Sequence, residues 1–340
     1  MERATPTVRW GILGTGQIST AFATGLTVLP DAALVAIGSR AAATAGAFGA
    51  RFGIPRRGQH ASYDALADDP DVDIVFVGTP HQRHLDCTLR CLAAGKAVMC
   101  EKPFAINTGE ASAMVAAARN ANLLLMEAMW MRFTPAMVEI RALLEEGSIG
   151  EVRMVSADLG FRASEGRPLR LFDLAYGGGA LLDVGVYLLS FASMILGTPT
   201  RLASLATLGD AGVDEQAGIL LGYDGGQIAI LSTAIRTGTP VVATIMGTSG
   251  RIDIHSEWHK PTVFTLHRDG HEPRRVERPW HGNGYNYEAA EAMRALRAGE
   301  LESPIVPLDE TLAIVQTMDH LRAAWGLRFP ADVARSAVRL

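Results

Sequence analysis

The chain has 340 residues, with 31 Lys or Arg against 36 Asp or Glu, so its formal net charge is −5. Hydrophobic residues make up 48% and charged residues 20%, a composition that excludes a mainly disordered chain. The mild negative charge argues against a nucleic-acid-binding surface. The length predicts roughly two domains of about 150 residues each.

The sequence indicates neither a membrane span nor an exported, disulfide-linked protein. The apolar stretch over residues 180–196 is shorter than the roughly 18 residues that cross a bilayer and carries Asp183, so we expect a buried helix. The first ten residues lack the apolar core of a signal peptide. Cys87, Cys91 and Cys100 are too few for a disulfide framework, which favours a cytoplasmic location.

Strand-like and helical patterns alternate in the first third of the chain. Short apolar runs predict strands over residues 8–13, 33–37, 73–77, 97–100 and 123–126. Helical spacing predicts a first helix that starts near Gln17. It predicts three more helices, over residues 41–52, 82–93 and 108–119. Strands separated by single helices form parallel sheets with right-handed crossovers. We therefore expect an α/β domain with a doubly wound parallel sheet over residues 1–126.

The pattern changes in residues 127–340. Helices are predicted over residues 135–144, 180–196, 287–298 and 308–325. Strands are predicted over residues 152–157, 201–207, 217–223, 227–235, 241–246 and 262–267. Strands that follow one another directly form antiparallel sheets. We expect a second domain of α+β type, built on an open, mainly antiparallel sheet.

A glycine-rich turn follows the first predicted strand. Gly14 and Gly16 occupy the first two glycine positions of the dinucleotide-binding fingerprint, and Ser19 stands at the third. Gly14 permits the tight turn, and Gly16 lets a pyrophosphate approach the backbone. Gln17 and Ile18 begin a helix whose free N–H groups favour an anion. We interpret the turn as a nucleotide site, and a purely structural turn is the alternative.

The end of the second predicted strand indicates which nucleotide is bound. Sites for NAD usually place Asp or Glu there to bind the ribose hydroxyls, whereas this chain has Gly38-Ser39-Arg40. A hydroxyl and a guanidinium suit a 2′-phosphate, so Ser39 and Arg40 favour NADP, although use of NAD stays open. A solvent-exposed arginine at the start of the next helix is the alternative.

Polar residues also follow the third predicted strand. Thr79 and Pro80 end it, and His81 and His84 come within the next helical turn. Because ligands bind at the carboxyl ends of parallel strands, we expect Thr79, Pro80 and His84 to contact the cofactor. Helix capping is the alternative for the histidines. No Cys or carboxylate completes a ligand set with them, so we expect no metal.

Glu101-Lys102-Pro103 follows the fourth predicted strand. The charged pair lies at a strand end, because burying it unpaired would be costly. We place Glu101 and Lys102 beside the cofactor. There the lysine charge lowers the pKa of a neighbouring acid–base group and binds a substrate oxygen. An ordinary surface turn is the alternative.

The run from Gly177 to Tyr187 carries further chemistry. Three glycines allow close backbone approach before a helix, and Asp183 and Tyr187, four residues apart, share one helical face. The ordinary pKa of a tyrosine is about 10, and a nearby ammonium lowers it. Tyr187 with Lys102 is therefore a candidate acid–base couple. Asp183 is a candidate to orient the substrate or the lysine, with local capping as the alternative.

Four elements of the chain, taken in order, resemble the glucose–fructose oxidoreductase/inositol dehydrogenase family of NAD(P)-dependent enzymes. They are Gly14-Thr15-Gly16, Thr79-Pro80, Glu101-Lys102-Pro103 and the Gly-Gly-Gly-x₃-Asp-x-Gly-x-Tyr run. The resemblance covers nearly the whole chain. Most members have histidine at the position of Tyr187. Tyrosine there, together with residues 126–133, resembles the branch of dimeric dihydrodiol dehydrogenases and NADP-dependent D-xylose 1-dehydrogenases.

This resemblance implies an N-terminal Rossmann fold and a second domain whose sheet forms a homodimer or higher homo-oligomer through its outer face. It implies that the catalytic lysine, aspartate and acid–base residue are Lys102, Asp183 and Tyr187. It also implies an aromatic lining of the substrate cleft at Trp130, Phe161, Trp258 and Tyr287. Ordinary core packing is the alternative for these aromatic residues.

We therefore expect an NADP-dependent enzyme that transfers a hydride between the nicotinamide and a hydroxyl-bearing carbon of a sugar or cyclic polyol, similar to an aldose 1-dehydrogenase. A trans-dihydrodiol dehydrogenase or a reductase of sugar-derived ketones is the second hypothesis. A non-catalytic NADP-sensing protein is the third, and the retention of Lys102 and Tyr187 argues against it.

Overall fold

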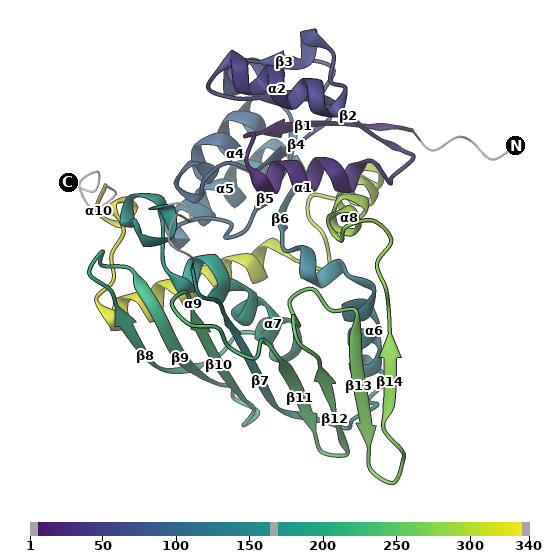
Figure 1. Cartoon of the computed structure of the whole chain (residues 1–340), viewed down its shortest axis with the longest axis vertical. Coiled ribbons are helices and arrows are strands. Elements are labelled where there is room, and N and C mark those ends of the chain that lie inside the picture. Colours follow the sequence, from purple (N-terminus) through teal and green to yellow (C-terminus); the bar gives the residue numbers. More distant parts are fainter. Residues whose placement is uncertain (1–5, 164–168, 335–340) are drawn as a thin grey trace, which may run out of the picture. The chain divides into compact units, whose positions relative to one another are not determined.

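A computed structural model describes residues 6–163 and 169–334, and the chain divides into two compact units (Figure 1). Unit 1 consists of Met1–Ala105, Gly109–Trp130 and His281–Thr311. Unit 2 consists of Ile106–Thr108, Met131–Trp280 and Leu312–Leu340. The expected domains, residues 1–126 and 127–340, follow the chain continuously, whereas each compact unit is assembled from three segments.

Unit 1 is built on a six-stranded sheet in the order β3-β2-β1-β4-β5-β6, in which all neighbouring strands are parallel. The strands are β1 (Val8–Leu13), β2 (Ala32–Gly38), β3 (Gln59–His60), β4 (Ile74–Val77), β5 (Ala97–Glu101) and β6 (Leu125–Ala128). The strand order reverses between β1 and β4, as in doubly wound sheets. The predicted Rossmann fold is therefore confirmed.

Aromatic packing fixes the first helix, α1 (Gln17–Leu26), against this sheet. Phe22 of α1 stacks on Phe76 of β4 with ring centroids 4.0 Å apart, and it meets Trp10 of β1 edge-on at 5.1 Å. All three side chains are fully buried. Burial of aromatic rings of this size contributes strongly to stability, and it sets the glycine-rich turn against the carboxyl ends of β1 and β4.

The other α-helices of unit 1 are α2 (Ala42–Phe52), α3 (Tyr63–Ala67), α4 (His84–Ala93), α5 (Thr108–Ala121) and α8 (Tyr285–Ala298). Helix α8 comes from far along the chain and packs against α1 (Figure 1). A Cβ on Gly25 of α1 would lie only 3.0 Å from the backbone nitrogen of Asn286. Asn283, just before α8, donates a hydrogen bond to the carbonyl of Ala21 at 2.8 Å.

Unit 2 is built on an eight-stranded sheet in the order β14-β13-β12-β11-β7-β10-β9-β8. Its strands are β7 (Val152–Gly160), β8 (Arg201–Leu208), β9 (Asp214–Gly222), β10 (Ile228–Ala234), β11 (Ala243–Gly247), β12 (Gly250–Ile254), β13 (Val263–Arg268) and β14 (Arg274–Glu277). Neighbours are antiparallel except β7 and β10, which are parallel. The predicted open, mainly antiparallel sheet is confirmed.

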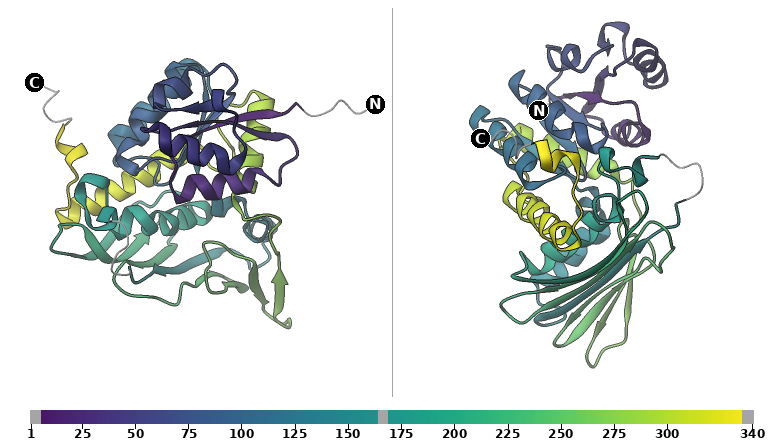
Figure 2. Two further views of the ribbon diagram at one scale, coloured as in Figure 1. Left: turned by 45° about the horizontal axis from the view of Figure 1, so that its top comes forward. Right: turned by 90° about the vertical axis from the view of Figure 1, so that its left-hand side faces the viewer.

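Helices cover one face of this sheet (Figure 2). The other face carries exposed side chains. The helices of unit 2 are α6 (Pro135–Glu145), α7 (Val186–Leu196), α9 (Leu308–Trp325) and α10 (Pro330–Ala334). Helix α7 packs on β7 and β10, and Trp325 of α9 donates a hydrogen bond to Ser204 of β8 at 2.9 Å. On the opposite face, Leu205 is 84% exposed and Ile230 is 46% exposed.

The segment Leu174–Leu196 is long and apolar enough to cross a membrane, with a mean hydropathy of 1.8. However, 72% of its most apolar window is buried within the protein, as in the core helix of a globular domain. The expectation of a buried helix over residues 180–196 therefore holds.

Two strands of unit 2, β12 and β14, were not apparent from the sequence. Strands β11 and β12 pair at Gly247 and Gly250, so only Thr248 and Ser249 connect them, without the Asn-Gly or Asp-Gly signal of a tight hairpin. Strand β14 consists of charged residues around one buried residue, Val276. Its pattern is therefore too polar to indicate a strand.

Candidate active site

The fingerprint turn between β1 and α1 has the geometry of an anion site. Gly14 has a φ of +97°, and a Cβ there would lie 2.7 Å from the carbonyl oxygen of Gly78, so only glycine fits. At Gly16, nothing lies within 4 Å of the position that a Cβ would take. Gly16 caps α1 without a side chain, and the first turn of α1 contains no acid. The N–H groups at Gln17 and Ile18 are therefore open to an anionic ligand.

Ser19 occupies the third fingerprint position, on the helix, where a glycine is usual. Its buried hydroxyl donates a hydrogen bond to the carbonyl of Gly78 at 3.4 Å. A Cβ on Gly78 would in turn lie 2.6 Å from the Ser19 Oγ. The close approach that a glycine on the helix normally permits is here permitted by a glycine at the end of β4.

Ser39 and Arg40 follow β2 at the same edge of the sheet. Ser39 is buried, and its hydroxyl lies 2.5 Å from the hydroxyl of Thr44 in α2. Arg40 is exposed, and within residues 6–163 and 169–334 no carboxylate forms an ion pair with it. A guanidinium without an acidic neighbour suits a phosphate better than a ribose hydroxyl.

His84 links two of the predicted cofactor segments. It is fully buried, and its Nε2 and Nδ1 atoms each lie 2.9 Å from a backbone carbonyl oxygen, those of Thr79 and Pro103. Burial lowers the pKa of His84, more than the carbonyl contacts raise it, so the ring is neutral at pH 7. A neutral ring has one N–H, which donates to one of these two carbonyls. This geometry favours support of the Thr79 and Pro103 segments over direct contact with a nucleotide.

Glu101 and Lys102 lie where β5 ends. Glu101 is buried, Lys102 is half-buried, and the Lys102–Pro103 peptide bond is cis. Thr79 and Pro80 follow the neighbouring strand, β4. The predicted cofactor residues thus lie at the carboxyl edge of the unit 1 sheet: Gly14, Gly16, Gln17, Ile18, Ser39, Arg40, Thr79, Pro80, Glu101 and Lys102.

Helix α8 adds two residues near Glu101 that sequence reasoning missed. Glu288 is fully buried, and its carboxyl oxygens have no hydrogen-bond partner among the described residues. Burial, and then the charge of Glu101, raise the pKa of Glu288 well above its ordinary value. The same causes raise the pKa of Tyr285, whose ring stacks on Trp130 with centroids 4.8 Å apart. The only signal in the sequence is that Tyr285 and Glu288 lie three positions apart, on one side of a helix.

Asp183 and Tyr187 share a helix in unit 2, as predicted. Asp183 lies in a π-helical turn, Leu181–Gly185, and Tyr187 lies in the first turn of α7. Asp183 forms an ion pair with Arg170 at 3.9 Å, and its side chain is 14% exposed. Tyr187 is buried, with its ring 5.8 Å from that of His259. π-Helical turns inside α-helices are frequent at functional sites, and no residue pattern in the sequence predicted this one.

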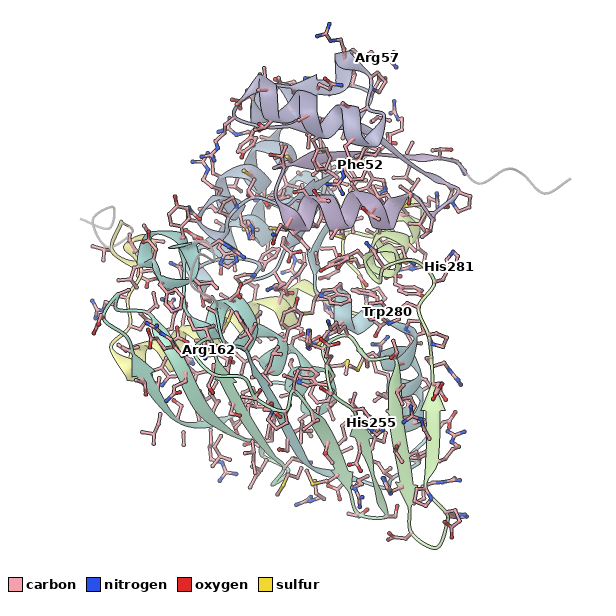
Figure 3. The ribbon with its side chains drawn as sticks, viewed as in Figure 1. Phe52, Arg57, Arg162, His255, Trp280 and His281 are labelled. Atoms are coloured by element: carbon pink, nitrogen blue, oxygen red, sulfur yellow. The ribbon has the colours of Figure 1, made fainter. Side chains whose placement is uncertain are left out.

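The four predicted aromatic residues have different surroundings. Trp130 is buried in its stack with Tyr285. Phe161 is half-buried and directly precedes Arg162 of unit 2, which is labelled in Figure 3. Trp258 is fully buried, and its Nε1 donates to the carbonyl of Asp158 at 2.7 Å, which favours a core role. The Tyr287 hydroxyl accepts a hydrogen bond from the backbone N–H of His281 at 2.7 Å.

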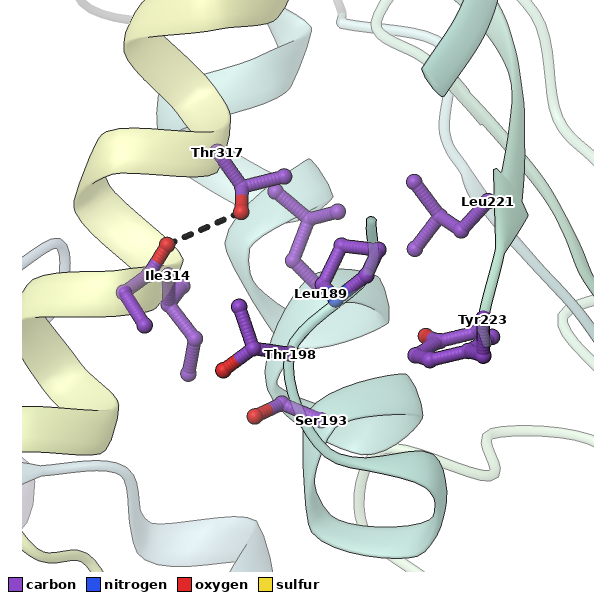
Figure 4. A pocket seen from close by; sticks show the side chains of 9 residues that line it. Leu189, Ser193, Thr198, Leu221, Tyr223, Ile314 and Thr317 are labelled. Carbon is purple, nitrogen blue, oxygen red and sulfur yellow. Dashed lines mark hydrogen bonds between the residues drawn. The ribbon is translucent and has the colours of Figure 1, made fainter. Parts of the chain in front are cut away.

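A small cavity in unit 2 lies between α7, α9 and β9 (Figure 4). Its volume is about 10 Å³, and it is lined by Leu189, Ser193, Thr198, Leu221, Tyr223 and Thr317, among others. A space of this size holds at most one water molecule, so it is no substrate site. Among the described residues, no three His, Cys, Asp or Glu side chains gather as a metal site.

Comparison with known proteins decides the family. Residues 8–129 match the family described as "Oxidoreductase family, NAD-binding Rossmann fold", and residues 137–253 match the "GFO/IDH/MocA C-terminal domain". The trans-1,2-dihydrobenzene-1,2-diol dehydrogenase of Mus musculus is 37% identical over 337 residues, covering 96% of this chain and 99% of that protein. The chain belongs to the GFO/IDH/MocA oxidoreductase family.

Another relative and two solved structures also match nearly the full length of this chain. The Homo sapiens trans-1,2-dihydrobenzene-1,2-diol dehydrogenase is 35% identical over 96% of this chain and 99% of that protein. An aldose-aldose oxidoreductase from Caulobacter crescentus, crystallised with glycerol, superposes with a TM-score of 0.85 at 28% identity, covering 95% and 98% of the two chains. A 3-ketoreductase from Actinomadura kijaniata, crystallised with NADP and TDP-benzene, gives a TM-score of 0.82 at 28% identity, covering 93% and 97%. The chain is thus an oxidoreductase with a nicotinamide-nucleotide-binding Rossmann fold.

Proposed function

We propose that the protein is an NADP-dependent dehydrogenase that acts on a hydroxyl-bearing carbon of a sugar or cyclic polyol. The observation that carries this proposal is the placement of half-buried Asp183 and buried Tyr187 four residues apart in one helical segment, in a chain whose Rossmann unit also presents Lys102 at a strand end. A phenol and a carboxylate are expensive to place in apolar surroundings. Proton transfer at a substrate hydroxyl is a function that would retain them there.

The residues of unit 1 fit a dinucleotide. The open space at Gly16 and the uncapped start of α1 suit a pyrophosphate, and exposed Arg40 suits the 2′-phosphate of NADP. Bound nicotinamide would supply the hydride acceptor or donor, which no side chain can replace. The 3-ketoreductase with 28% identity was crystallised with NADP, which supports the same choice here.

Tyr187 would take the proton of the substrate hydroxyl during oxidation and return it during reduction. We propose that Lys102 stabilises the tyrosinate and the alkoxide by its charge, and that Asp183 orients the substrate or the lysine. Substitutions of one lysine and of one tyrosine occur among the solved structures of the 3-ketoreductase, which supports a role for these residue types. Proton transfer of this kind contributes about 10²- to 10⁴-fold to the rate.

Aromatic residues would shape the substrate cleft. We propose Trp130, stacked on Tyr285, and half-buried Phe161 as contacts, with Trp258 and Tyr287 supporting the walls. Such surfaces suit the C–H face of a sugar ring, and they suit an aromatic dihydrodiol equally well. A trans-dihydrodiol dehydrogenase is therefore the second candidate, favoured by the names of the curated relatives.

A substrate screen tests the proposal. The enzyme is mixed with D-xylose, D-glucose, inositols and a trans-dihydrodiol of benzene, each with NADP⁺ and with NAD⁺, and formation of the reduced nucleotide is followed by absorbance. Faster turnover of a sugar or polyol with NADP⁺ is expected. Faster turnover of the dihydrodiol would favour the second candidate. Tight NADP binding without turnover of any compound would contradict both and favour the sensing protein.

The exposed face of the unit 2 sheet suits a second copy of the chain. Leu205, Leu220 and Ile230 are exposed on this face. Leu220 of β9 pairs directly with Ile230 of β10, and Leu205 of β8 pairs with Gly218, two residues before Leu220. A groove of about 360 Å³ beside them is lined by Gln216, Gly218 and Ser232. We propose a homodimer through this face. Light scattering should give the dimer mass for wild type and a monomer for Leu205→Arg, and an unchanged mass for this variant would contradict the proposed interface.

The thiols fit a reducing compartment. Burial raises the pKa of Cys87 to about 11 and of Cys91 to about 12, so these thiols are unreactive. We propose a cytoplasmic location, which cell fractionation tests. We also propose that residues 1–126 bind the nucleotide and residues 127–340 bind substrate and form oligomers, with residues 281–311 packed onto the first unit.

A further inference from the structure

Asp214 is a buried carboxyl group that the chemistry proposed above does not use. It is the first residue of β9 and is completely buried. Its Oδ2 accepts a 2.6 Å hydrogen bond from the backbone N–H of Leu181. Leu181 begins the π-helical turn that leads into α7. Asp214 therefore holds the start of the helical segment that carries Asp183 and Tyr187, although it lies far from both in the sequence.

The glycine run before this helix is shaped around Asp214. Gly179 has a φ of +113°, and a Cβ on it would lie 2.1 Å from Oδ1 of Asp214. A Cβ on Gly178 would lie 2.5 Å from the carbonyl oxygen of Arg170. A side chain at Gly179 would push the run away from β9, and one at Gly178 would push it away from the backbone of Arg170 and Leu171. Gly179 and Asp214 therefore pack directly against each other at the start of the helix.

Asp214 is retained at an energetic cost. Its Oδ1 has no hydrogen-bond partner among the described residues. Burial raises the pKa of Asp214 to about 7, while the N–H groups of Leu181 and Ala180 and the guanidinium of Arg322 oppose this rise. Arg322 itself pairs with Asp319 and Asp332. A buried, incompletely paired carboxyl destabilises the fold, which argues for a functional reason to keep it.

We propose that Asp214 is a positioning residue for Tyr187: by accepting the N–H of Leu181, it fixes where the helix begins and therefore where the phenol lies. This inference rests on the acid–base role proposed for Tyr187. A displacement of about 1 Å in a reacting group can lower turnover by about 10²-fold. The anchoring of one helical turn is therefore sufficient to control kcat.

A graded series of substitutions tests the proposal. Asp214→Asn keeps the shape and one oxygen acceptor, Asp214→Ser keeps a shorter acceptor, and Asp214→Ala keeps none. Glu215→Gln is the matched control, because Glu215 is the next residue of β9 and pairs with Arg236 at 2.7 Å instead of with the helix. Asp214→Asn changes no volume, so the series contains a folded member even where Ala at this position prevents folding.

Two measurements are made on each folded variant. Hydrogen–deuterium exchange of the peptide over residues 179–190 reports how firmly the helix start is held, and steady-state kinetics separate kcat from KM. We expect exchange to accelerate and kcat to fall together in the order Asn, Ser, Ala, with a loss of kcat of about tenfold or more for Ala. NADP affinity should stay within about twofold, and Glu215→Gln should match the wild type in both measurements.

The proposal is overturned by a variant with faster exchange but wild-type kcat, or by lowered kcat with wild-type exchange. A residue that only stabilises the fold would lower the unfolding temperature and leave kcat of the folded enzyme unchanged. Tyr187→Phe is measured in parallel. An active Tyr187→Phe enzyme would refute the acid–base role, whereas an inactive one beside a fully active Asp214→Ala enzyme would refute only the positioning role.

Discussion

The Nδ1 atom of His84 lies 2.9 Å from the carbonyl oxygen of Pro103, so a fully buried histidine joins α4 to the turn that carries Lys102. Its Nε2 atom reaches the carbonyl of Thr79 in the same way. One side chain thus holds together two strand ends that the family's sequence motifs mark separately. Its part in the site is mechanical support for residues whose own positions matter to chemistry.

Replacing His84 should therefore weaken both the fold and the site. His84→Ala removes the buried ring that contacts both carbonyls and its one N–H donor, and we expect a loss of about 1–3 kcal/mol in the free energy of unfolding. Because the Lys102 turn is then less firmly held, kcat should also fall, by about tenfold. Denaturant unfolding and steady-state kinetics measure the two effects. His320→Ala, at an exposed histidine of α9, is the control and should change neither.

The phenol of Tyr187 is expected to matter for turnover and not for cofactor binding. Tyr187→Phe should lower kcat at least about a hundredfold, while the Kd of NADP measured by fluorescence titration stays unchanged. Tyr223→Phe is a matched control, because the Tyr223 hydroxyl is also buried in unit 2 and lacks a hydrogen-bond partner among the described residues. Equal activity of the two variants would remove Tyr187 from the mechanism.

We expect Arg40 to determine the preference of the enzyme for NADP over NAD. Arg40→Asp places a negative charge where the 2′-phosphate would lie, so affinity for NADP should fall by about tenfold or more while affinity for NAD changes little. Arg57→Asp, at an exposed arginine of the same unit, controls for the change in net charge. Equal losses for NADP and NAD would contradict the proposed contact.

Asp214 should make the stability of the protein depend on pH. Burial raises its pKa to about 7 in the folded protein, whereas the pKa of an unfolded aspartate is about 3.9. Between these values the folded state binds a proton that the unfolded state does not. The stabilising contribution is therefore complete below about pH 4 and is lost as the pH rises through about 7.

Asn does not titrate, so the free energy of unfolding of the wild type should fall relative to that of Asp214→Asn as the pH rises from 4 to 8. Each unit of pKa elevation corresponds to about 1.4 kcal/mol. Chemical denaturation at several pH values measures the difference. Parallel curves for the two proteins would show that Asp214 does not titrate in this range.

Short-range patterns were enough to predict the parallel sheet and the glycine-rich turn. The apolar runs of β1 and β4 are buried on both faces, and the apolar residues of each strand are sufficient to predict this burial. Asp183 and Tyr187 were predicted on one helix for the same reason. The π-helical turn beneath them was not, because it forms where Gly179 meets Asp214, a residue contributed by a distant strand.

The roles of Glu288 and Tyr285 were hidden for a related reason. In the sequence both belong to an ordinary polar helix, and the start of that helix was predicted two residues too late. Their burial arises only when α8 packs on the Rossmann sheet. A contact of this kind depends on tertiary structure, so no local pattern of residues predicts it.

Helix α8 also affects how the protein folds during translation. The six parallel strands, on which α1 packs through Phe22, are synthesised early, but the second packing partner of α1, helix α8, is complete only after Asn283 and Asn286 have emerged from the ribosome. Until then, the apolar side of α1 around Gly25 faces solvent. The nascent chain therefore carries an unfinished nucleotide-binding unit through most of translation, with the side of α1 that faces α8 still uncovered.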